Sequence, residues 1–330
     1  MKKYSAIKRL LLVTLQCAVL GMVVSTNATA QTAKPPAAVK SNDLVLNGDA
    51  KCTKCHDEGD SPGVLAIGKT KHGTRADGRT PTCTSCHGES GNHLNNPAGL
   101  SERPKPDRIF TKNSKNTAHE RNDACLSCHQ KDAKRHLWVG SAHETNDVAC
   151  TSCHQVHAAH DKVRDKRTQP EVCFTCHKEQ RSQVNKPSHH PVLEGKVACS
   201  DCHNPHGSAG PKLMKRDSVV ETCYQCHMEK RGPFVHDHRP VSDDCTNCHM
   251  PHGTVADNLL KARPPLVCYQ CHSGHGTPGV AGIAPGITNS PKANTNIEQA
   301  RGCVNCHTEI HGSNNPNGGQ NLLPPSFFLR

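Results

Sequence analysis

Cys199-Ser-Asp-Cys202-His203-Asn-Pro-His206-Gly207 is the clearest copy of a pattern that recurs along this chain. The segment contains Cys-x-x-Cys-His, followed three residues later by a second histidine. Cys-x-x-Cys-His is the attachment signal for c-type haem. The two thiols add to the vinyl groups of one porphyrin, and the adjacent histidine binds the iron as its proximal ligand. The segment therefore predicts a covalently bound haem and offers His206 as a further candidate ligand.

The motif occurs ten times and uses every cysteine except Cys17, since 21 cysteines less one equals ten pairs. A single copy would be compatible with a zinc knuckle or a redox dithiol. A disulfide scaffold would not explain why a histidine follows each pair. We therefore predict ten covalently bound haem c groups. The predicted thioether residues are Cys52, Cys55, Cys83, Cys86, Cys125, Cys128, Cys150, Cys153, Cys173, Cys176, Cys199, Cys202, Cys223, Cys226, Cys245, Cys248, Cys268, Cys271, Cys303 and Cys306. The predicted proximal ligands are His56, His87, His129, His154, His177, His203, His227, His249, His272 and His307.

Alternate motifs resemble each other, so the chain repeats in units of two motifs. Cys125 to Cys173, Cys173 to Cys223 and Cys223 to Cys268 are separated by 48, 50 and 45 residues. Each unit offers one further histidine between its motifs and another after its second motif. This rule gives ten candidate distal ligands for ten irons, which predicts bis-histidine ligation: His72, His93, His143, His157, His190, His206, His238, His252, His275 and His311. A histidine three residues after a motif cannot easily reach the opposite face of its own haem. We expect it to bind the iron of a neighbouring haem.

Five histidines remain outside this rule, and we interpret them as surface residues: His119, His136, His160, His189 and His236. His189 adjoins His190, and His236 lies two residues before His238. Residue spacing alone therefore leaves both choices open. The sequence also leaves open which distal histidine serves which haem.

The composition excludes a conventional α/β enzyme. The chain has one Trp, three Tyr and five Phe in 330 residues, and its mean hydropathy is −0.67. Aromatic side chains normally supply much of the buried area of a core. The 23 prolines and 25 glycines leave little room for long helices. We predict a multihaem cytochrome c fold, mostly irregular with short α-helices and few strands. Its core would be packed by haem, in an elongated haem chain of repeated two-haem units. Short helices are predicted over 169–180 and 219–230, and loops over 91–115 and 276–300.

The N-terminal segment is typical of a secretory signal peptide. Lys2, Lys3, Lys8 and Arg9 precede an apolar run over 10–24, and Ala28-Thr-Ala30 resembles a cleavage site. We predict a signal peptide over 1–30, a flexible leader over 31–50 and a decahaem domain over 51–330. Haems 1–5 would occupy about 51–178, and haems 6–10 about 179–330. No apolar stretch of about 18 residues follows residue 30, so the mature chain is not expected to cross a bilayer by itself.

The whole predicted mature chain resembles the decahaem cytochromes of the MtrA, MtoA, PioA and DmsE group of metal-reducing and iron-oxidising bacteria. The resemblance rests on the ten motifs and on local runs. These are Lys71-His72-Gly73, Cys150-Thr-Ser-Cys-His-Gln-Val-His157, Cys199–Gly207, Glu229-Lys-Arg-Gly-Pro233, Cys303-Val-Asn-Cys-His307 and Ile310-His311-Gly-Ser313. In that group a Ser-His-Pro stretch carries a ligand, which favours His190 over His189. A Glu-His-x-Pro-Val stretch favours His238, here within Asp237-His238-Arg-Pro-Val241.

The resemblance implies a haem wire inside an outer-membrane β-barrel porin, carrying electrons between the periplasm and the cell surface. The implied location is the periplasm, in association with the outer membrane. Implied partners are the porin, periplasmic or inner-membrane cytochromes, and an extracellular multihaem cytochrome or iron species. The process would be extracellular electron transfer, either Fe(II) oxidation or Fe(III) and metal reduction. The direction of flow is left open.

Two other functions deserve comparison with the conduit. One is a soluble periplasmic carrier that feeds a terminal reductase such as a dimethyl sulfoxide reductase. The other is a multihaem enzyme related to nitrite reductases, which would need an open iron position. Because ten candidate ligands match ten irons, we predict an electron-transfer protein without a catalytic residue. The net charge of +11 does not predict nucleic-acid binding, because basic runs with interleaved aromatic residues are absent from the sequence and haem propionates would reverse the charge.

Overall fold

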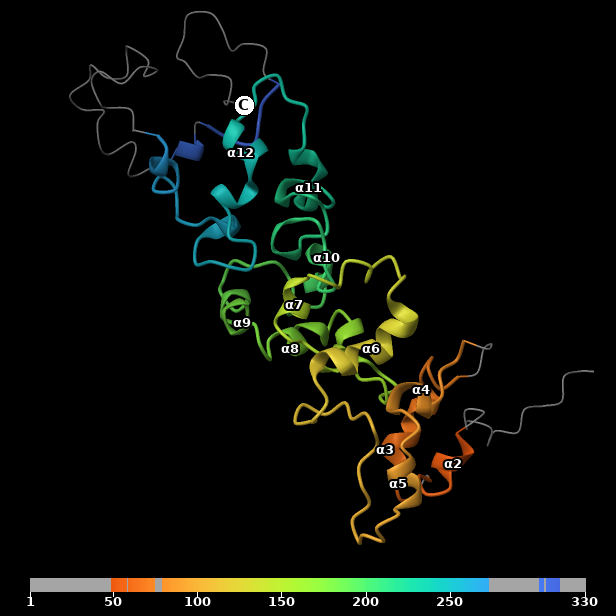
Figure 1. The fold of residues 1–330 in the computed structure, drawn as a ribbon. Helices are drawn as coiled ribbons and strands as arrows, with labels where there is room; N and C mark the ends of the chain where they lie inside the picture. Colours follow the sequence, from red (N-terminus) through yellow and green to blue (C-terminus); the bar gives the residue numbers. More distant parts are fainter. Residues whose placement is uncertain (1–48, 58, 75–78, 273–302, 306, 315–330) are drawn as a thin grey trace, which may run out of the picture. The chain divides into compact units, whose positions relative to one another are not determined.

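The fold is described by a computed structural model, shown in Figure 1. It describes residues 49–57, 59–74, 79–272, 303–305 and 307–314, all within one compact unit spanning Leu44–Arg330. The predicted signal peptide, the leader up to residue 48, Cys306, His275 and the predicted loop 276–300 lie outside these residues. Asp49 is 1 % exposed and Ala50 begins a helix, so the last two residues of the predicted leader belong to the folded region.

Short helices joined by irregular segments make up the described chain (Figure 1). The longest is α6, with 12 residues. The α-helices are α2 Ala50–Thr53, α3 Pro62–Leu65, α4 Cys83–His87, α5 Gly91–Asn95, α6 Ala118–His129, α7 Ala142–Thr145, α8 Gln169–Cys173, α9 Lys178–Val184, α10 Cys199–Cys202, α11 Val219–Cys223 and α12 Arg239–Asp243. The 3-10 turns are η1 Ala66–Lys69, η2 Cys150–Ser152, η3 Lys162–Arg164, η4 Pro211–Leu213, η5 Met228–Lys230, η6 Cys245–Asn247, η7 Asp257–Leu259, η8 Cys268–Gln270 and η9 Cys303–Asn305. Extended pairing in the described residues is limited to isolated bridges, which confirms the predicted fold class.

The haem motifs set where several helices end. Thr117 begins α6 through a reciprocal capping box with Glu120, and the helix ends at the motif histidine His129. The helices predicted over 169–180 and 219–230 are each interrupted within the motif. The first divides into α8 and α9, and the second into α11 and η5. This prediction was wrong in extent because the motif makes its own turn, in which His177 and His227 donate N–H groups to the carbonyls of Cys173 and Cys223.

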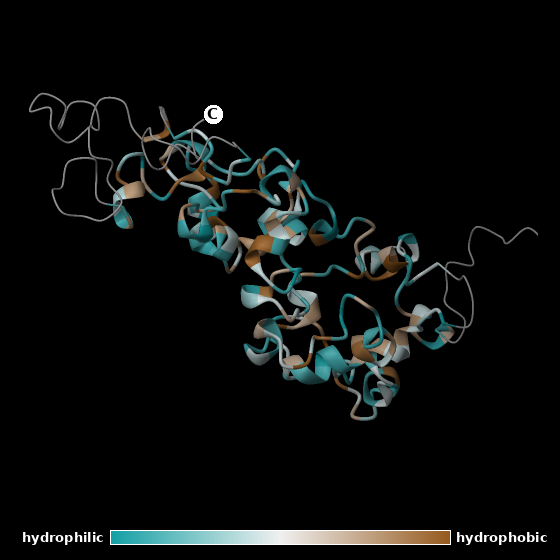
Figure 2. Cartoon of the chain, turned by 90° about the horizontal axis from the view of Figure 1, so that it is seen from above, coloured by the Kyte–Doolittle hydropathy of each residue, from teal (hydrophilic) through white to brown (hydrophobic). Residues whose placement is uncertain are grey.

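Few apolar side chains are buried by the protein itself. Among the described residues they are Ala118, Trp138, Ala149, Phe174, Val184, Val192, Ala198, Val220 and Ala256. Figure 2 shows hydrophobic residues scattered between hydrophilic ones along the chain. Four of the nine are alanines, which contribute little apolar area to a core. This pattern is consistent with a core that is packed by haem.

The loop predicted after the second motif was only partly correct. The loop predicted over 91–115 contains α5, so it was wrong at its start, and the remaining residues form turns and extended segments. Trp138 is the single tryptophan of the chain. Its side chain is 6 % exposed, and its ring centroid lies 6.4 Å from that of His206, the distal candidate after the sixth motif.

Candidate haem-binding sites

The structure brings motif histidines together with the predicted distal histidines. We number the sites 1 to 10 in the order of their motifs. Nine motif histidines each face one candidate, with ring centroids 5.9–6.3 Å apart. In site order the pairs are His56 with His93, His87 with His157, His129 with His72, His154 with His206, His177 with His143, His203 with His252, His227 with His190, His249 with His311 and His272 with His238. His307 of site 10 is described, but its predicted partner His275 is not.

The separation of the paired rings fits one metal ion between two imidazoles. A metal–nitrogen bond is about 2.0 Å long and the ring centroid lies about 1.1 Å beyond that nitrogen, so two opposed ligands place their centroids about 6 Å apart. The observed range of 5.9–6.3 Å matches this distance in every described pair. The residues therefore fit haem iron held between two histidines.

Hydrogen bonds at Nδ1 orient many of these rings. The Nδ1 atoms of His87, His93 and His157 lie 2.9, 2.7 and 2.7 Å from the carbonyl oxygens of Arg108, Pro104 and Val64. An Nδ1–H that donates to a carbonyl fixes the tautomer and leaves Nε2 as the free, basic nitrogen. These partners therefore prepare Nε2 to bind iron.

Burial keeps several of the paired rings neutral. Burial and the facing His154 imidazole lower the pKa of His206 to about 4. Burial likewise lowers the pKa of His203 and His252, which face each other in site 6. A histidine must be deprotonated at the coordinating nitrogen before it can bind a metal. These rings are thus in the ligand-ready form at neutral pH.

Adjacent two-motif units exchange their distal histidines. The histidine between the motifs of one unit faces the first motif of the next unit, as His143 faces His177 and His190 faces His227. The histidine after the second motif faces back, as His206 faces His154. Sequence reasoning expected the trailing histidines to serve neighbouring haems, and the structure places four of them opposite the preceding unit. His93 is the exception, since it faces His56 of its own unit.

A repeated hydrogen bond strengthens this exchange. His143, His190 and His238 each place Nδ1 2.7–3.0 Å from the carbonyl oxygen of Pro205, Pro251 and Ile310 respectively. Each acceptor immediately precedes a trailing distal histidine of the next unit. Each bond therefore links a histidine between two motifs to the backbone beside the trailing histidine of the next unit.

The glycine after the trailing histidine permits the units to approach closely. Gly207, Gly253 and Gly312 have φ of 112°, 147° and 131°, a region that favours glycine. A Cβ atom at Gly207 or Gly253 would overlap the carbonyl oxygen of Leu137 or Gln183. The His-Gly dipeptide of the motif is therefore a structural requirement of the contact between units.

Substitution of Gly253 tests this requirement. Gly253→Ala is expected to destabilise the holoprotein by roughly 1–3 kcal/mol, because the Cβ would meet backbone and the φ is strained. The neighbouring His252 would shift relative to His203, which perturbs the low-spin signal of one haem. Thermal unfolding and electron paramagnetic resonance (EPR) measure the two effects. The control is Gly63→Ala in α3, where a Cβ meets nothing within 4 Å. Equal behaviour of the two variants would contradict the prediction.

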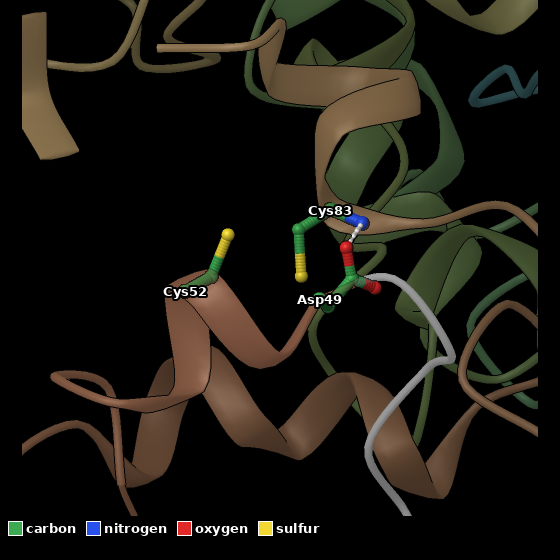
Figure 3. A group of neighbouring side chains, drawn as sticks. All are labelled: Asp49, Cys52 and Cys83. Atoms are coloured by element: carbon green, nitrogen blue, oxygen red, sulfur yellow. Dashed lines mark hydrogen bonds between the residues drawn. The ribbon is translucent and has the colours of Figure 1, made fainter. Parts of the chain in front are cut away.

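The first cysteines of the two motifs in a unit lie side by side. Figure 3 shows Cys52 and Cys83, with Asp49 accepting a 2.8 Å hydrogen bond from the Cys83 backbone N–H. The two sulfurs and an Asp49 oxygen lie within 4.8 Å of one another. Burial and the Asp49 carboxylate raise the pKa of Cys83 to about 12. Since both sulfurs are predicted thioether positions, this cluster belongs to haem sites 1 and 2.

The spare histidines make contacts of a different kind. His119 and His160 lie 3.7 and 3.6 Å from the carboxylates of Asp123 and Asp165. His136 Nδ1 lies 2.7 Å from the Ala133 carbonyl oxygen. His189 Nδ1 lies 2.6 Å from the Lys186 carbonyl oxygen, and His236 bonds through its backbone to Ser313. Thus His190 and His238, the choices favoured by the family resemblance, are the ones placed opposite motif histidines.

Comparison with known proteins identifies the family. Residues 83–170 match the family of NrfB-like cytochrome c-type proteins, and residues 189–232 and 238–277 each match the doubled CXXCH motif family. The chain is 44 % identical over 275 residues to multiheme cytochrome MtrA of Shewanella baltica, covering 82 % of this chain and 80 % of that protein. It is 31 % identical over 150 residues to cytochrome c-type protein NrfB of Haemophilus influenzae, covering 40 % of this chain and 66 % of that protein.

These similarities confirm the predicted multihaem c-type cytochrome. Its Cys-x-x-Cys-His motifs bind haem c, and its role is electron transfer. The described residues contain no helix long and apolar enough to span a membrane. On the strength of the MtrA match, which extends over most of both proteins, the chain belongs to the MtrA family of multihaem c-type cytochromes.

Proposed function

We propose that this chain carries ten bis-histidine haem c groups and conducts electrons through an outer-membrane β-barrel porin, in extracellular electron transfer. The haem irons supply one-electron exchange between Fe(III) and Fe(II). The protein attaches each haem, fills both axial positions and places the sites in sequence. The observation that carries the proposal is the order in which the attachment cysteines meet.

Within each unit, the first cysteines of the two motifs interact. The thiols of Cys125 and Cys150 lie within hydrogen-bonding distance, which raises the pKa of Cys125 and lowers that of Cys150. The same contact recurs in the other units, between Cys52 and Cys83, Cys173 and Cys199, Cys223 and Cys245, and Cys268 and Cys303. Haems attached at these sulfurs would be neighbours in the pairs 1–2, 3–4, 5–6, 7–8 and 9–10.

Between units, the second cysteines lie close enough for their charges to interact. Burial and the nearby charge of Cys176 raise the pKa of Cys153, so sites 4 and 5 adjoin. The corresponding neighbours are Cys86 with Cys125 and Cys128, Cys202 with Cys226, and Cys248 with Cys271. These contacts supply the missing steps from site 2 to 3, 6 to 7 and 8 to 9. The alternation supports an unbroken path through the sites in motif order, as a conduit requires.

Paired histidines at the irons favour electron transfer over catalysis. A multihaem reductase needs an iron with an open or exchangeable position, whereas nine of the described motif histidines each face a second histidine. At site 10 we assign His307 and His275 as the pair, because they are the motif histidine and the distal candidate that remain once the nine described pairs are made. Histidine pairs without methionine also favour low potentials, since methionine ligation raises them.

A porin is the proposed route across the outer membrane. A chain with 40 basic and 29 acidic side chains cannot face lipid, whereas a large barrel has a polar interior that can enclose it. Periplasmic or inner-membrane cytochromes would exchange electrons at one end, and an extracellular multihaem cytochrome or iron species at the other. Either direction of flow uses the same path, so Fe(II) oxidation and Fe(III) reduction are both compatible with it.

Extraction of native outer membranes tests the proposal. We expect the cytochrome to co-purify with a β-barrel protein through detergent size exclusion. In liposomes, this complex should oxidise reduced methyl viologen trapped inside when Fe(III) is added outside, with one Fe(II) formed per electron transferred. Liposomes with the barrel alone are the control. A cytochrome released entirely with the periplasmic fraction, without a barrel, would overturn the conduit and favour a soluble carrier to a terminal reductase.

A further inference from the structure

The proximal histidines of the second motif in each unit usually bond to a backbone carbonyl. The Nδ1 atoms of His87, His203 and His249 lie 2.9, 3.0 and 2.9 Å from the carbonyl oxygens of Arg108, Lys212 and Asn258. In the third and fourth units the acceptor lies nine residues after the histidine. Lys212 and Asn258 have φ of 51° and 57°, which shows that the loop conformation is repeated.

Site 4 departs from this repeat. Its proximal histidine, His154, places Nδ1 2.7 Å from Oδ2 of Asp161, so a carboxylate replaces the carbonyl. The other carboxylate oxygen accepts the backbone N–H of Gln155 at 3.3 Å. The Asp161 side chain is only 18 % exposed, and in the described part of the chain it forms no ion pair with a lysine or arginine. His154 is therefore the main side-chain partner of the Asp161 carboxylate.

Site 3 offers an internal comparison. His129 Nδ1 lies 2.8 Å from Oδ2 of Asp132, but Arg135 forms an ion pair with the same carboxylate. The Asp132 side chain is also 41 % exposed. Solvent and a guanidinium both offset the charge that reaches His129. Sites 3 and 4 thus share the same hydrogen bond from the proximal histidine to an aspartate. The aspartate charge is offset by Arg135 and solvent at site 3 but not at site 4.

We propose that Asp161 lowers the redox potential of the haem attached at Cys150 and Cys153. A carboxylate that accepts the Nδ1–H draws that proton toward itself and makes Nε2 a stronger electron donor. Stronger donation stabilises Fe(III) relative to Fe(II), which lowers the potential of this one-electron couple. The proton stays in the hydrogen bond, so electron transfer needs no proton exchange. The inference rests on the proposed ligation of that iron by His154 and His206.

The position of site 4 gives the effect a consequence for conduction. In the motif order proposed above, every electron crossing the chain passes site 4. A low-potential site within the path makes uphill any step that reduces it from a higher-potential neighbour. Asp161 would then control the rate of transfer between sites 1–3 and sites 5–10 while leaving the overall driving force unchanged.

Asp161→Asn is the direct test, because it keeps the shape and a hydrogen-bond acceptor but removes the charge. We expect one midpoint potential to rise in a spectroelectrochemical titration of the holoprotein, with all haems still low-spin and one ferric EPR signal shifted. Asp132→Asn should produce a smaller rise. Asp161→Glu should restore much of the original potential.

Asp165→Asn is the matched control, because it removes the same charge four residues away. Its carboxylate lies 3.6 Å from the spare His160. An equal effect of Asp165→Asn and Asp161→Asn would overturn the inference, since it would show only a through-space charge effect.

His206→Met separates the inference from the ligation on which it depends. If His206 binds the site 4 iron, methionine in its place should raise one potential strongly and produce the spectrum of a methionine–histidine haem. A response to His206→Met combined with none to Asp161→Asn would refute the role of Asp161 and leave the ligation standing. No response to either variant would refute the assignment of both ligands.

Discussion

Replacing His190 with alanine is expected to leave one reduced haem able to bind carbon monoxide, whereas replacing His189 is expected to leave none. The His190 ring centroid lies 6.3 Å from that of His227, and its Nδ1 lies 2.7 Å from the Pro251 carbonyl oxygen. Loss of this ring would leave His227 as the single axial ligand at site 7. A five-coordinate iron is high-spin and binds carbon monoxide at the open position.

His189 is a closely matched control, because it is the same residue type at the adjacent position. Its Nδ1 lies 2.6 Å from the Lys186 carbonyl oxygen, and its Nε2 lies 3.4 Å from Glu194. Titration of the reduced proteins should give one carbon monoxide per chain for His190→Ala and none for His189→Ala or the unmodified protein. Binding in the unmodified protein would revive the enzyme alternative. Binding in His189→Ala alone would reverse the assignment at site 7.

The haem motifs and the set of candidate ligands were accessible from sequence because their chemistry is local. Cys-x-x-Cys-His needs only five consecutive residues, and the two-motif repeat supplied a count of distal histidines. The pairing was not accessible, because eight of the nine described pairs join one unit to another. His72 faces His129 and His157 faces His87, contacts that depend on how the units pack.

Hydrogen-bond partners were also hidden from residue spacing. Asp161 follows His154 by seven residues, and no motif marks it as different from the other acidic residues nearby. Only its departure from the carbonyl partners of His203 and His249 distinguishes it. Such residues can therefore be found by comparing equivalent positions of the units once the histidine pairs are known.

Helix extents failed for a physical reason that the sequence does contain. Residues 169–180 have good helix-forming content, but the motif turn over 173–177 competes with the helical path and divides it into α8 and α9. By contrast, α6 continues through its motif to His129 from a strong capping box at Thr117. Short helices were predictable, whereas their ends depend on the balance between capping and attachment geometry.

Preventing haem attachment is expected to abolish the cooperative fold of the whole chain. The described residues bury only two large aromatic side chains, Trp138 and Phe174, and three valines. Folding must offset a backbone entropy of about 1–2 kcal/mol per residue, which a protein core normally does by burying apolar surface. Here the paired histidines and the cysteines converge on the positions where haem would pack, so binding energy becomes folding energy, as it does at structural metal sites.

The chain without residues 1–30, produced in the cytoplasm where c-type haem is not attached, provides the apoprotein. Its far-ultraviolet circular dichroism should lack most of the helical signal of the holoprotein, and urea should produce a gradual change without a sigmoidal transition. Holoprotein in the same buffer is the control for the native signal. A second control adds free haem to the apoprotein, because recovery without thioether bonds would separate packing from covalent attachment. Native-like dichroism with a sigmoidal urea transition in the apoprotein would mean that the protein supplies its own core. The haem would then be bound by a preformed scaffold. Some interaction other than the few buried apolar residues would have to offset the loss of backbone entropy.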